Sequence, residues 1–493
     1  MALDPRTPVL IGSGQFQLHA DRFEDVLDPA TLMARSIELA AADAGLSGVP
    51  AADSIRVVNE LTWKYGNPGL IVAGILGLSP RETALSANGG NSAQSLVNLT
   101  AKEILAGDLD LAILTGGEAW RSRGKARKAD HQFNWPKAPE SAVPRALGED
   151  MVMNHPTEVA RGIVMPVQVY PMFETAIRAA AGESVEDHQV KISELWARFS
   201  AVAADNPNAW IRDAKSAEEI RTVTPSNRMI GFPYPKYMNS NNDVDMAASV
   251  IICSVGKAEE LGVPRDRWVF PLSGSDCHEH PFISNRWTFA ETPAIALGGK
   301  RALELAGIGI DDVEVVDLYS CFPSAVQLGA KSLGLAVDSQ LTRTGGLPFA
   351  GGPWNNYPMH AIATVMNDLR DRPGANGLVW ANGGYTTKHA FGVYSTTAPT
   401  APFRHAYPQD EIDAMPRREL ADAPDAAGGA TIEAYTVMHN REGAPENVIV
   451  ACLLADGRRA WGTSTDATLA AGMCAGEWVG RNAELAPDGT IAA

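Results

Sequence analysis

The spacing of hydrophobic positions alternates along the chain between a helical period and short β-branched runs. Apolar residues recur at helical spacing over 29–44, and the run 55–61 that follows is rich in β-formers. The same succession returns at 293–306 and 313–318. A covering helix followed by a buried strand is typical of βαβ units. The pattern therefore predicts an α/β protein that contains two copies of one unit.

Each copy continues with a second helix and a second strand. The first copy predicts a helix over 92–106 and a strand over 111–114, and the second predicts a helix over 357–369 and a strand over 377–380. The last of these strands runs into Gly383-Gly384, and a glycine pair after a buried strand permits tight turns. Active sites in folds with such crossovers lie beyond the strand ends.

The segments outside the repeat differ in composition from it. A proline- and aromatic-rich stretch, which contains one amphipathic helix over 185–204, interrupts the first copy, and we interpret it as a lid that shapes a substrate pocket. A length of 493 residues indicates several domains. We predict these parts: a first half at 1–118 with 244–268, an inserted loop domain at 119–243, a second half at 269–396, a linker at 397–430 and a β domain at 431–493.

The C-terminal part changes to a β pattern. Runs at 431–438, 447–454 and 458–462 alternate as strands do, and Asp456-Gly457 between the last two is a hairpin signal. The proline-rich stretch before them is typical of an extended linker. We expect a small β-barrel, of the OB (oligonucleotide/oligosaccharide-binding) type.

Composition narrows the classes of function. No run of about 18 apolar residues occurs, so no membrane span is predicted. The five cysteines are scattered without a CxxC pair, which favours a reducing cytoplasm and neither a disulfide framework nor a metal site. The net charge of -17 opposes binding to nucleic acid or anionic membranes.

Four glycine- and asparagine-rich loops carry a resemblance to a known family: Asn88 to Ser92, Tyr319 to Phe322, Gly351-Gly352-Pro353, and Ala381 to Gly384. With them, residues 1 to about 400 resemble the thiolase superfamily, and most closely its sterol-carrier-type thiolase-like branch. The C-terminal part resembles the additional domain of bacterial thiolase-like type 1 proteins. The resemblance implies a duplicated five-layer thiolase fold, an acyl-CoA ligand and no tightly bound cofactor.

The same resemblance implies that the residues of thiolase chemistry are missing. By register with Gln94, Gly89 stands where thiolases carry the nucleophilic cysteine. Ala381 stands at the second cysteine, Gly352 at the histidine and Tyr319 at the asparagine or histidine that holds water. Thiolysis needs a thiolate to accept the acyl group. Little or no thiolysis or Claisen condensation is therefore expected.

Other side chains are candidates for a role at the same loops. Cys321, Tyr319, Tyr385 and His389 are the candidate catalytic groups, although a free cysteine is more often a small buried hydrophobe and a lone histidine more often structural. The implied contacts to acyl-CoA come from Gly351, Gly383 and Gly384. Arg121, Arg123 and Lys125 form a basic cluster that is either a solvated surface loop or a cradle for coenzyme A phosphates.

Three functions stay open on the sequence. The first is an acyl-CoA-handling protein of lipid or sterol metabolism without thiolase chemistry, monomeric or homodimeric. The second is a cysteine-independent retro-aldolase on β-hydroxyacyl-CoA, because thiolase-like aldolases of steroid side-chain breakdown resemble this chain at Tyr319 and use an OB-type partner. The third is nucleic-acid binding through the C-terminal barrel, with Trp461 and Arg459 among the candidate contacts. The acidic composition argues against the third.

Overall fold

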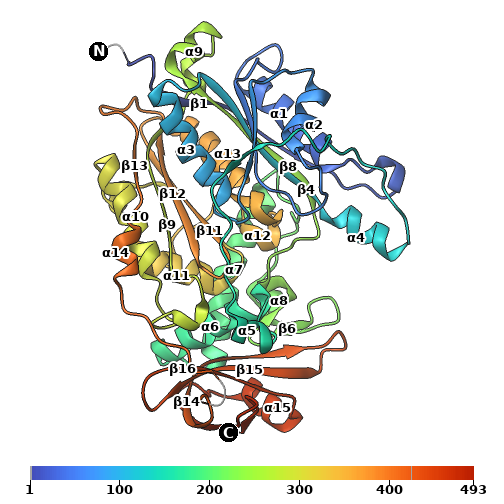
Figure 1. The fold of residues 1–493 in the computed structure, drawn as a ribbon, viewed down its shortest axis with the longest axis vertical. Coiled ribbons are helices and arrows are strands. Elements are labelled where there is room, and N and C mark those ends of the chain that lie inside the picture. The colour runs from blue at the N-terminus through green and yellow to red at the C-terminus, as the bar shows by residue number, and fades with distance from the viewer. Residues whose placement is uncertain (1–2, 423–424, 493) are drawn as a thin grey trace.

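The computed structural model describes residues 3–422 and 425–492, so residues 1–2 at the start and 423–424 of the predicted linker lie outside the described residues. Two sheets form the body of the molecule, and a third lies at its C-terminal end (Figure 1). The first sheet has the order β1 (Pro8–Gln17), β8 (Asp245–Ser254), β4 (Leu111–Ala119), β2 (Ser54–Val57), β3 (Glu82–Ser86), β5 (Arg145–Leu147). The second has the order β10 (Val315–Leu318), β11 (Asn376–Gly383), β12 (Lys388–Ser395), β9 (Phe270–His278), β13 (Arg404–Ala406).

The pairing of the strands confirms the predicted duplication. In the first sheet β1 pairs antiparallel with β8, β8 antiparallel with β4, and β4 parallel with β2. In the second sheet β9, β12, β11 and β10 repeat the same three pairings in the same order. The two halves therefore share one topology, with the predicted crossover helix before each parallel strand.

Helices arrange the two sheets into five layers. α1 (Pro29–Asp43) and α2 (Pro68–Leu76) pack on the first sheet, while α10 (Pro293–Ala306) and α11 (Pro323–Leu333) pack on the second. α3 (Ser92–Ala106) and α13 (Tyr357–Arg370) contact strands of both sheets and form the middle layer (Figure 1). The five-layer thiolase-like fold is thus confirmed.

Local sequence signals place the ends of these helices. Asp28 caps α1 by accepting a hydrogen bond from the Ala30 amide, and Pro29 opens the helix. The predicted helices 92–106 and 293–306 are confirmed at both ends, and each stops before a left-handed glycine. The predicted strand 55–61 stops earlier, at Val57. The Asn59 amide bonds to the Ser86 hydroxyl, and the amides of Leu61 and Thr62 bond to the Glu118 carboxylate, so these residues pair with side chains instead of with a strand.

The segment 119–243 packs between the two halves and the C-terminal sheet. Its α7 confirms the predicted amphipathic helix, and its α6 contacts both α11 and the C-terminal sheet. It also supplies β5 to the edge of the first sheet, beside β3. Besides β5, the helices and strands of this segment are α4 (Trp120–Lys128), α5 (Pro156–Ala160), α6 (Pro166–Ala181), α7 (Val185–Asp205), α8 (Ala217–Arg221), β6 (Met229–Gly231) and β7 (Tyr234–Pro235). Two short helices, α9 (Val255–Glu260) and α12 (Gly346–Phe349), belong to the first and the second half.

The segment 397–430 was expected to be an extended linker, and that expectation is wrong for part of it. β13 pairs parallel with β9 and so extends the second sheet, and α14 (Gln409–Asp413) packs on α10. A side-chain contact fixes β13 there, since His405 Nε2 lies 2.7 Å from Asp276 Oδ2 on β9. Proline content alone did not reveal this tertiary pairing.

The C-terminal strands form a mainly antiparallel sheet with the order β16 (Arg459–Ser464), β15 (Pro445–Leu454), β14 (Gly428–His439), β17 (Asn482–Leu485), β18 (Ile491–Ala492). α15 (Ala467–Ala475) lies between β16 and β17 in the chain, and β6 pairs with β14. One parallel bridge, Thr463 to Thr490, connects the two ends of the sheet. The hairpin at Gly457 is confirmed, whereas the OB type of this domain stays a prediction. In the described part of the chain, no helix is both long and apolar enough to cross a bilayer.

Candidate functional site

Loops from both halves and from the segment 119–243 enclose a cavity of about 300 Å³. Its walls begin where strands end: Gly89 and Gly90 follow β3, Tyr319 follows β10, and Asn382 lies at the end of β11. The cavity therefore occupies the region beyond the strand ends that the sequence predicts. It is lined by Leu61, Asn88, Gly89, Gly90, Met153, Met165, Pro166, Val167, Tyr170, Asn239, Ser240, Asn242, Tyr319, Cys321, Phe322, Leu347, Trp354, Asn355, Asn382, Gly384 and Tyr385.

Tyr319 reaches the loop 88–91. A Cβ atom built on Gly90 would collide with the Tyr319 hydroxyl and with the carbonyl of Asn382, so glycine is required at position 90 for this close approach. Burial raises the pKa of Tyr319 well above its ordinary value, and the nearby Cys321 thiol adds to the rise. Tyr319 is therefore a neutral hydroxyl at neutral pH.

Cys321 and Tyr385, two of the candidate catalytic groups, also line this cavity. Burial raises the pKa of the Cys321 thiol to about 12, so a thiolate does not form near neutral pH. Burial likewise raises the pKa of Tyr385, although its hydrogen bond to Asn154 works in the other direction. Both groups are protonated in the resting protein.

Tyr170, from α6, holds the turn that forms one wall of the cavity. Its hydroxyl accepts hydrogen bonds from Asn382 Nδ2 and from the Thr386 amide, and it donates to the carbonyl of Gly384, each at 3.0 Å. The ring stacks on Phe322 with centroids 4.6 Å apart. Tyr170 therefore fixes the position of Asn382 and Gly384, a role that its place in the sequence did not reveal.

Polar atoms without a partner face the cavity walls. The side-chain oxygens of Ser240, Asn239 and Asn382 are buried and lack a hydrogen-bond partner within the described residues, and so does Trp354 Nε1. Buried polar atoms are normally satisfied, so these groups are available to a ligand. The polar run 239–242 was the only sequence signal for this wall.

Neighbouring side chains fill the space at two positions where thiolase residues are expected. A Cβ atom on Gly89 would lie 2.6 Å from Lys388 Nζ and 2.5 Å from Asn91 Oδ1. A Cβ atom on Gly352 would collide with the hydroxyl of Ser240. The backbone therefore has no room for a cysteine or a histidine at these points without rearrangement.

His389 does not join the cavity. It lies in β12 between β11 and β9, fully buried, and Trp380 Nε1 donates a hydrogen bond of 3.3 Å to its Nδ1. Burial, and secondarily the charge of Arg286, hold the pKa of His389 well below its ordinary value. The histidine is neutral, and the structure gives it no contact with Tyr319, Cys321 or Tyr385 across the cavity. Ala381, Gly351, Gly352 and Gly383 also lie outside the residues that line it.

The basic cluster lies on α4, next to the cavity. Arg121 Nη1 and Lys125 Nζ donate to the carbonyl of Ala20, at 2.9 and 3.4 Å. Arg123 Nη1 donates at 3.0 Å to the carbonyl of Leu61, which itself lines the cavity. The cluster is thus part of a helix rather than the loop that one alternative predicts, and it lies beside one wall of the cavity.

Comparisons with known proteins agree with the thiolase-like fold of this chain. Residues 408–490 match the family profile of the thiolase-like protein type 1 additional C-terminal domain. The crystal structure of a monomeric SCP2-thiolase-like protein type 1 from Mycobacterium smegmatis superposes with a TM-score of 0.83 and 31% identity, covering 100% of both chains.

Catalytic thiolases are more distant relatives. The 3-ketoacyl-CoA thiolase of Aliivibrio fischeri is 30% identical over 133 residues, which is 27% of this chain and 32% of that protein. The chain thus matches only about a third of the length of this curated thiolase. The Ltp2-ChsH2(DUF35) aldolase has a TM-score of 0.59 at 17% identity over 79% of this chain and 98% of its own, a likeness of fold alone. From the full-length similarity to the mycobacterial structure, the chain belongs to the family of SCP2-thiolase-like proteins of type 1.

Proposed function

We propose that this protein binds an acyl-CoA thioester without forming a covalent acyl-enzyme, in lipid or sterol metabolism. One observation carries the proposal: among the residues that line the cavity, none has a charged side chain, and the ionisable ones are tyrosines and a cysteine. The raised pKa values of Tyr319, Cys321 and Tyr385 keep these groups neutral. The cavity therefore offers hydrogen bonds to a neutral thioester but no activated nucleophile.

The dimensions and surroundings of the cavity support this proposal. About 300 Å³ is at the lower end of the range for small-ligand pockets. It suits the acyl and thioester part of the ligand, while the nucleotide part would lie outside. Arg121, Arg123 and Lys125 stand beside the Leu61 wall and would attract its phosphates.

Titration calorimetry with acetyl-CoA, butyryl-CoA and free coenzyme A tests the proposal. We expect acyl-CoA to bind, and Ser240→Ala to weaken binding by roughly tenfold, because its buried hydroxyl has no other partner. Ser226→Ala, at an exposed serine, serves as the matched control and leaves affinity unchanged. Absence of binding at millimolar acyl-CoA, or thiolysis of acetoacetyl-CoA by the wild-type protein, would refute it.

A retro-aldolase is the second candidate, favoured by the Tyr319 hydroxyl that faces Gly90 in the cavity wall. The reaction would require Tyr319 to exchange a proton with the substrate, and its raised pKa opposes that step near neutral pH. Cleavage of β-hydroxyacyl-CoA by the wild-type protein and its loss in Tyr319→Phe would favour this candidate. Equal rates in both proteins would remove Tyr319 from any mechanism.

Two of the side chains that suggested nucleic-acid binding by the C-terminal domain are buried. Trp461 is 2% exposed and donates from Nε1 to Ser284 Oγ, and Arg459 is fully buried against the same loop. Stacking on bases needs exposed rings. We propose that these two residues instead fasten the domain to the thiolase-like body.

A further inference from the structure

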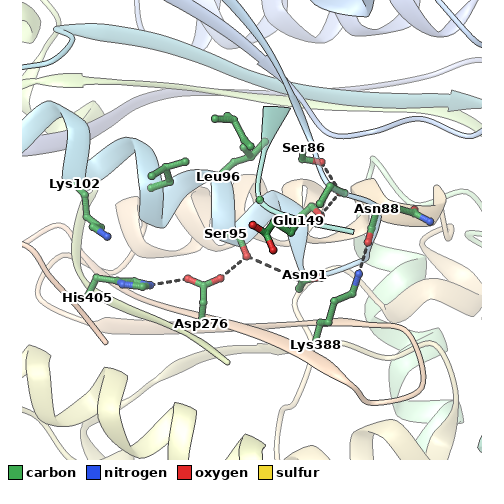
Figure 2. A pocket seen from close by; sticks show the side chains of 15 residues that line it. Ser86, Asn88, Asn91, Ser95, Leu96, Lys102, Glu149, Asp276, Lys388 and His405 are labelled. Atoms are coloured by element: carbon green, nitrogen blue, oxygen red, sulfur yellow. Dashed lines mark hydrogen bonds and ion pairs between the residues drawn. The ribbon is translucent and has the colours of Figure 1, made fainter. Parts of the chain in front are cut away.

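A second cavity, of about 340 Å³, lies beside the loop 88–91 that contributes to the acyl cavity (Figure 2). One face of α3 forms a long side of it, and strands β9, β12 and β13 of the second half contribute its opposite side. Asn88 belongs to the walls of both cavities. No role proposed above uses this second cavity.

Lys388 lies at one end of the second cavity, where it points toward Asn88 (Figure 2). It is 8% exposed, and its ammonium donates a hydrogen bond to the carbonyl of Asn88. Within residues 3–422 and 425–492, no carboxylate lies within ion-pair distance of its Nζ. A buried ammonium without a counter-ion is costly, and burial accordingly lowers the pKa of Lys388.

Acidic side chains lie near Lys388 without forming an ion pair with it: Asp276 and Glu149 line the same cavity, and Asp150 follows Glu149 in the chain (Figure 2). Asp276 Oδ1 accepts a hydrogen bond from Ser95 Oγ, and Asp276 Oδ2 lies 2.7 Å from His405 Nε2 (Figure 2). The same Oδ2 accepts a 2.8 Å hydrogen bond from Asn98 Nδ2. Asp150 accepts a 2.7 Å bond from the Asn88 amide. The charge of Asp150 partly offsets the effect of burial on the pKa of Lys388. Asp150, Asp276 and Glu149 nevertheless form no direct ion pair with Lys388, so among the described residues its ammonium has no carboxylate in contact at this end of the cavity.

The rest of the cavity wall is partly apolar. Leu96 and Leu99 project from successive positions of the same face of α3, and Leu147 of β5 joins them. Lys102, His405, Glu149 and Asp276 also line the cavity, but Lys388 is its buried ammonium without a direct ion pair to a described residue. A buried ammonium of this kind beside an aliphatic wall is complementary to an amphipathic anion. A phosphate alone would leave the aliphatic wall without a partner.

We propose that this second cavity binds a short-chain carboxylic acid in its ionised form, with the carboxylate on Lys388 and the alkyl chain against Leu96, Leu99 and Leu147. The carboxylate supplies the missing counter-ion, and the chain removes apolar surface from water. Because Lys388 bonds to Asn88, the bound acid contacts the loop that also walls the acyl cavity. The site differs from the proposed acyl-CoA site in both position and charge.

Titration calorimetry with butyrate and hexanoate, in the absence of coenzyme A, tests this site. Hexanoate is expected to bind more tightly, by roughly fourfold for each added methylene. Lys388→Met removes the cation and keeps the chain volume, so affinity should fall by roughly tenfold or more. Lys102→Met, at an exposed lysine of the same cavity, is the matched control and should change affinity by less than about twofold.

A second variant protects the test from a folding effect of Lys388→Met. Leu99→Asn lies at a half-buried position and should abolish the preference for hexanoate over butyrate while retaining the folded protein. The proposal is overturned if neither acid binds at millimolar concentration, or if Lys388→Met and wild type bind hexanoate equally. The proposal is also overturned if acetyl-CoA displaces hexanoate competitively and Ser240→Ala weakens the binding of hexanoate, because the acid would then occupy the acyl cavity. Binding of hexanoate without any binding of acyl-CoA would refute the proposed function and leave this site standing.

Discussion

Replacing Arg459 with methionine tests how the C-terminal domain is joined to the thiolase-like body. The guanidinium is fully buried and makes two 2.8 Å bonds to the Glu433 carboxylate. Its Nη1 also donates to the carbonyls of Ser284 and Arg286, at 2.7 and 2.6 Å. One side chain thus connects β16 to the loop 283–286 of the second half.

The contacts continue from this loop to the acyl cavity. Arg286 Nη2 donates to the carbonyls of Tyr385 and Thr386, at 3.1 and 2.7 Å, and Tyr385 lines the cavity. The carbonyl of Arg286 itself is held by Arg459. We therefore expect the loss of Arg459 to loosen the turn 383–387 as well as the domain contact.

The size of the effect follows from the burial of the pair. Removing Arg459 leaves Glu433, whose side chain is 11% exposed, with the weaker ion pair to Arg418 at 4.0 Å. It also leaves the carbonyls of Ser284 and Arg286 without the Arg459 donor. Breaking such a pair costs about 3–5 kcal/mol in the free energy of unfolding. If the turn 383–387 opens together with the contact between the C-terminal domain and the loop 283–286, hydrogen exchange of the backbone amides in that turn should accelerate by roughly 100-fold or more.

Urea unfolding and hydrogen–deuterium exchange measured by mass spectrometry check both expectations. The matched control is Arg458→Met, which removes the neighbouring arginine and its half-exposed pair with Asp456 and should cost less than about 1 kcal/mol. The reasoning fails if Arg459→Met costs no more than the control. It also fails if the peptide 383–387 keeps its wild-type protection while the C-terminal strands lose theirs.

Three further outcomes follow from the structure. Gly89→Cys should not create thiolase activity and should destabilise the fold by about 1–3 kcal/mol, because the new Cβ meets Lys388 Nζ at 2.6 Å; thiolysis assays and urea melts check this. Ala146→Pro in β5 removes a backbone donor that points away from β3, because the neighbouring Leu147 carbonyl accepts from the Ala87 amide; β5 should stay paired, and light scattering should match wild type. Burial alone would lower the pKa of His188, but its bonds to Glu174 and Glu183 outweigh that effect and raise it. The two ion pairs of His188 therefore stabilise the fold fully below about pH 6.5, and this contribution is lost as the pH rises through the raised pKa. The free energy of unfolding of His188→Gln should depend less on pH over that interval than that of wild type. An equal pH dependence in both proteins would contradict this role of His188.

The sequence determined the repeated architecture because each element carries its own local signal. The periodic apolar positions of 92–106 and 293–306, each closed by a glycine, were enough to place both helices at the residue level. The loops around Gly89, Tyr319 and Asn382 were recognisable for the same reason, since strand-end glycines and asparagines mark turns. These features depend on neighbours within a few positions of the chain.

Tertiary structure alone decided which groups meet. Arg286 and Arg459 are separated by 173 positions and show no local pattern, yet the hydrogen bond from the Arg459 guanidinium to the Arg286 carbonyl connects the C-terminal domain to the loop beside the cavity. His389 adjoins a recognisable turn, but in β12 its side chain is fully buried and lies outside the lining of the acyl cavity. Side-chain chemistry can be read from composition, whereas the burial and pairing that set its charge state arise only when distant segments pack together.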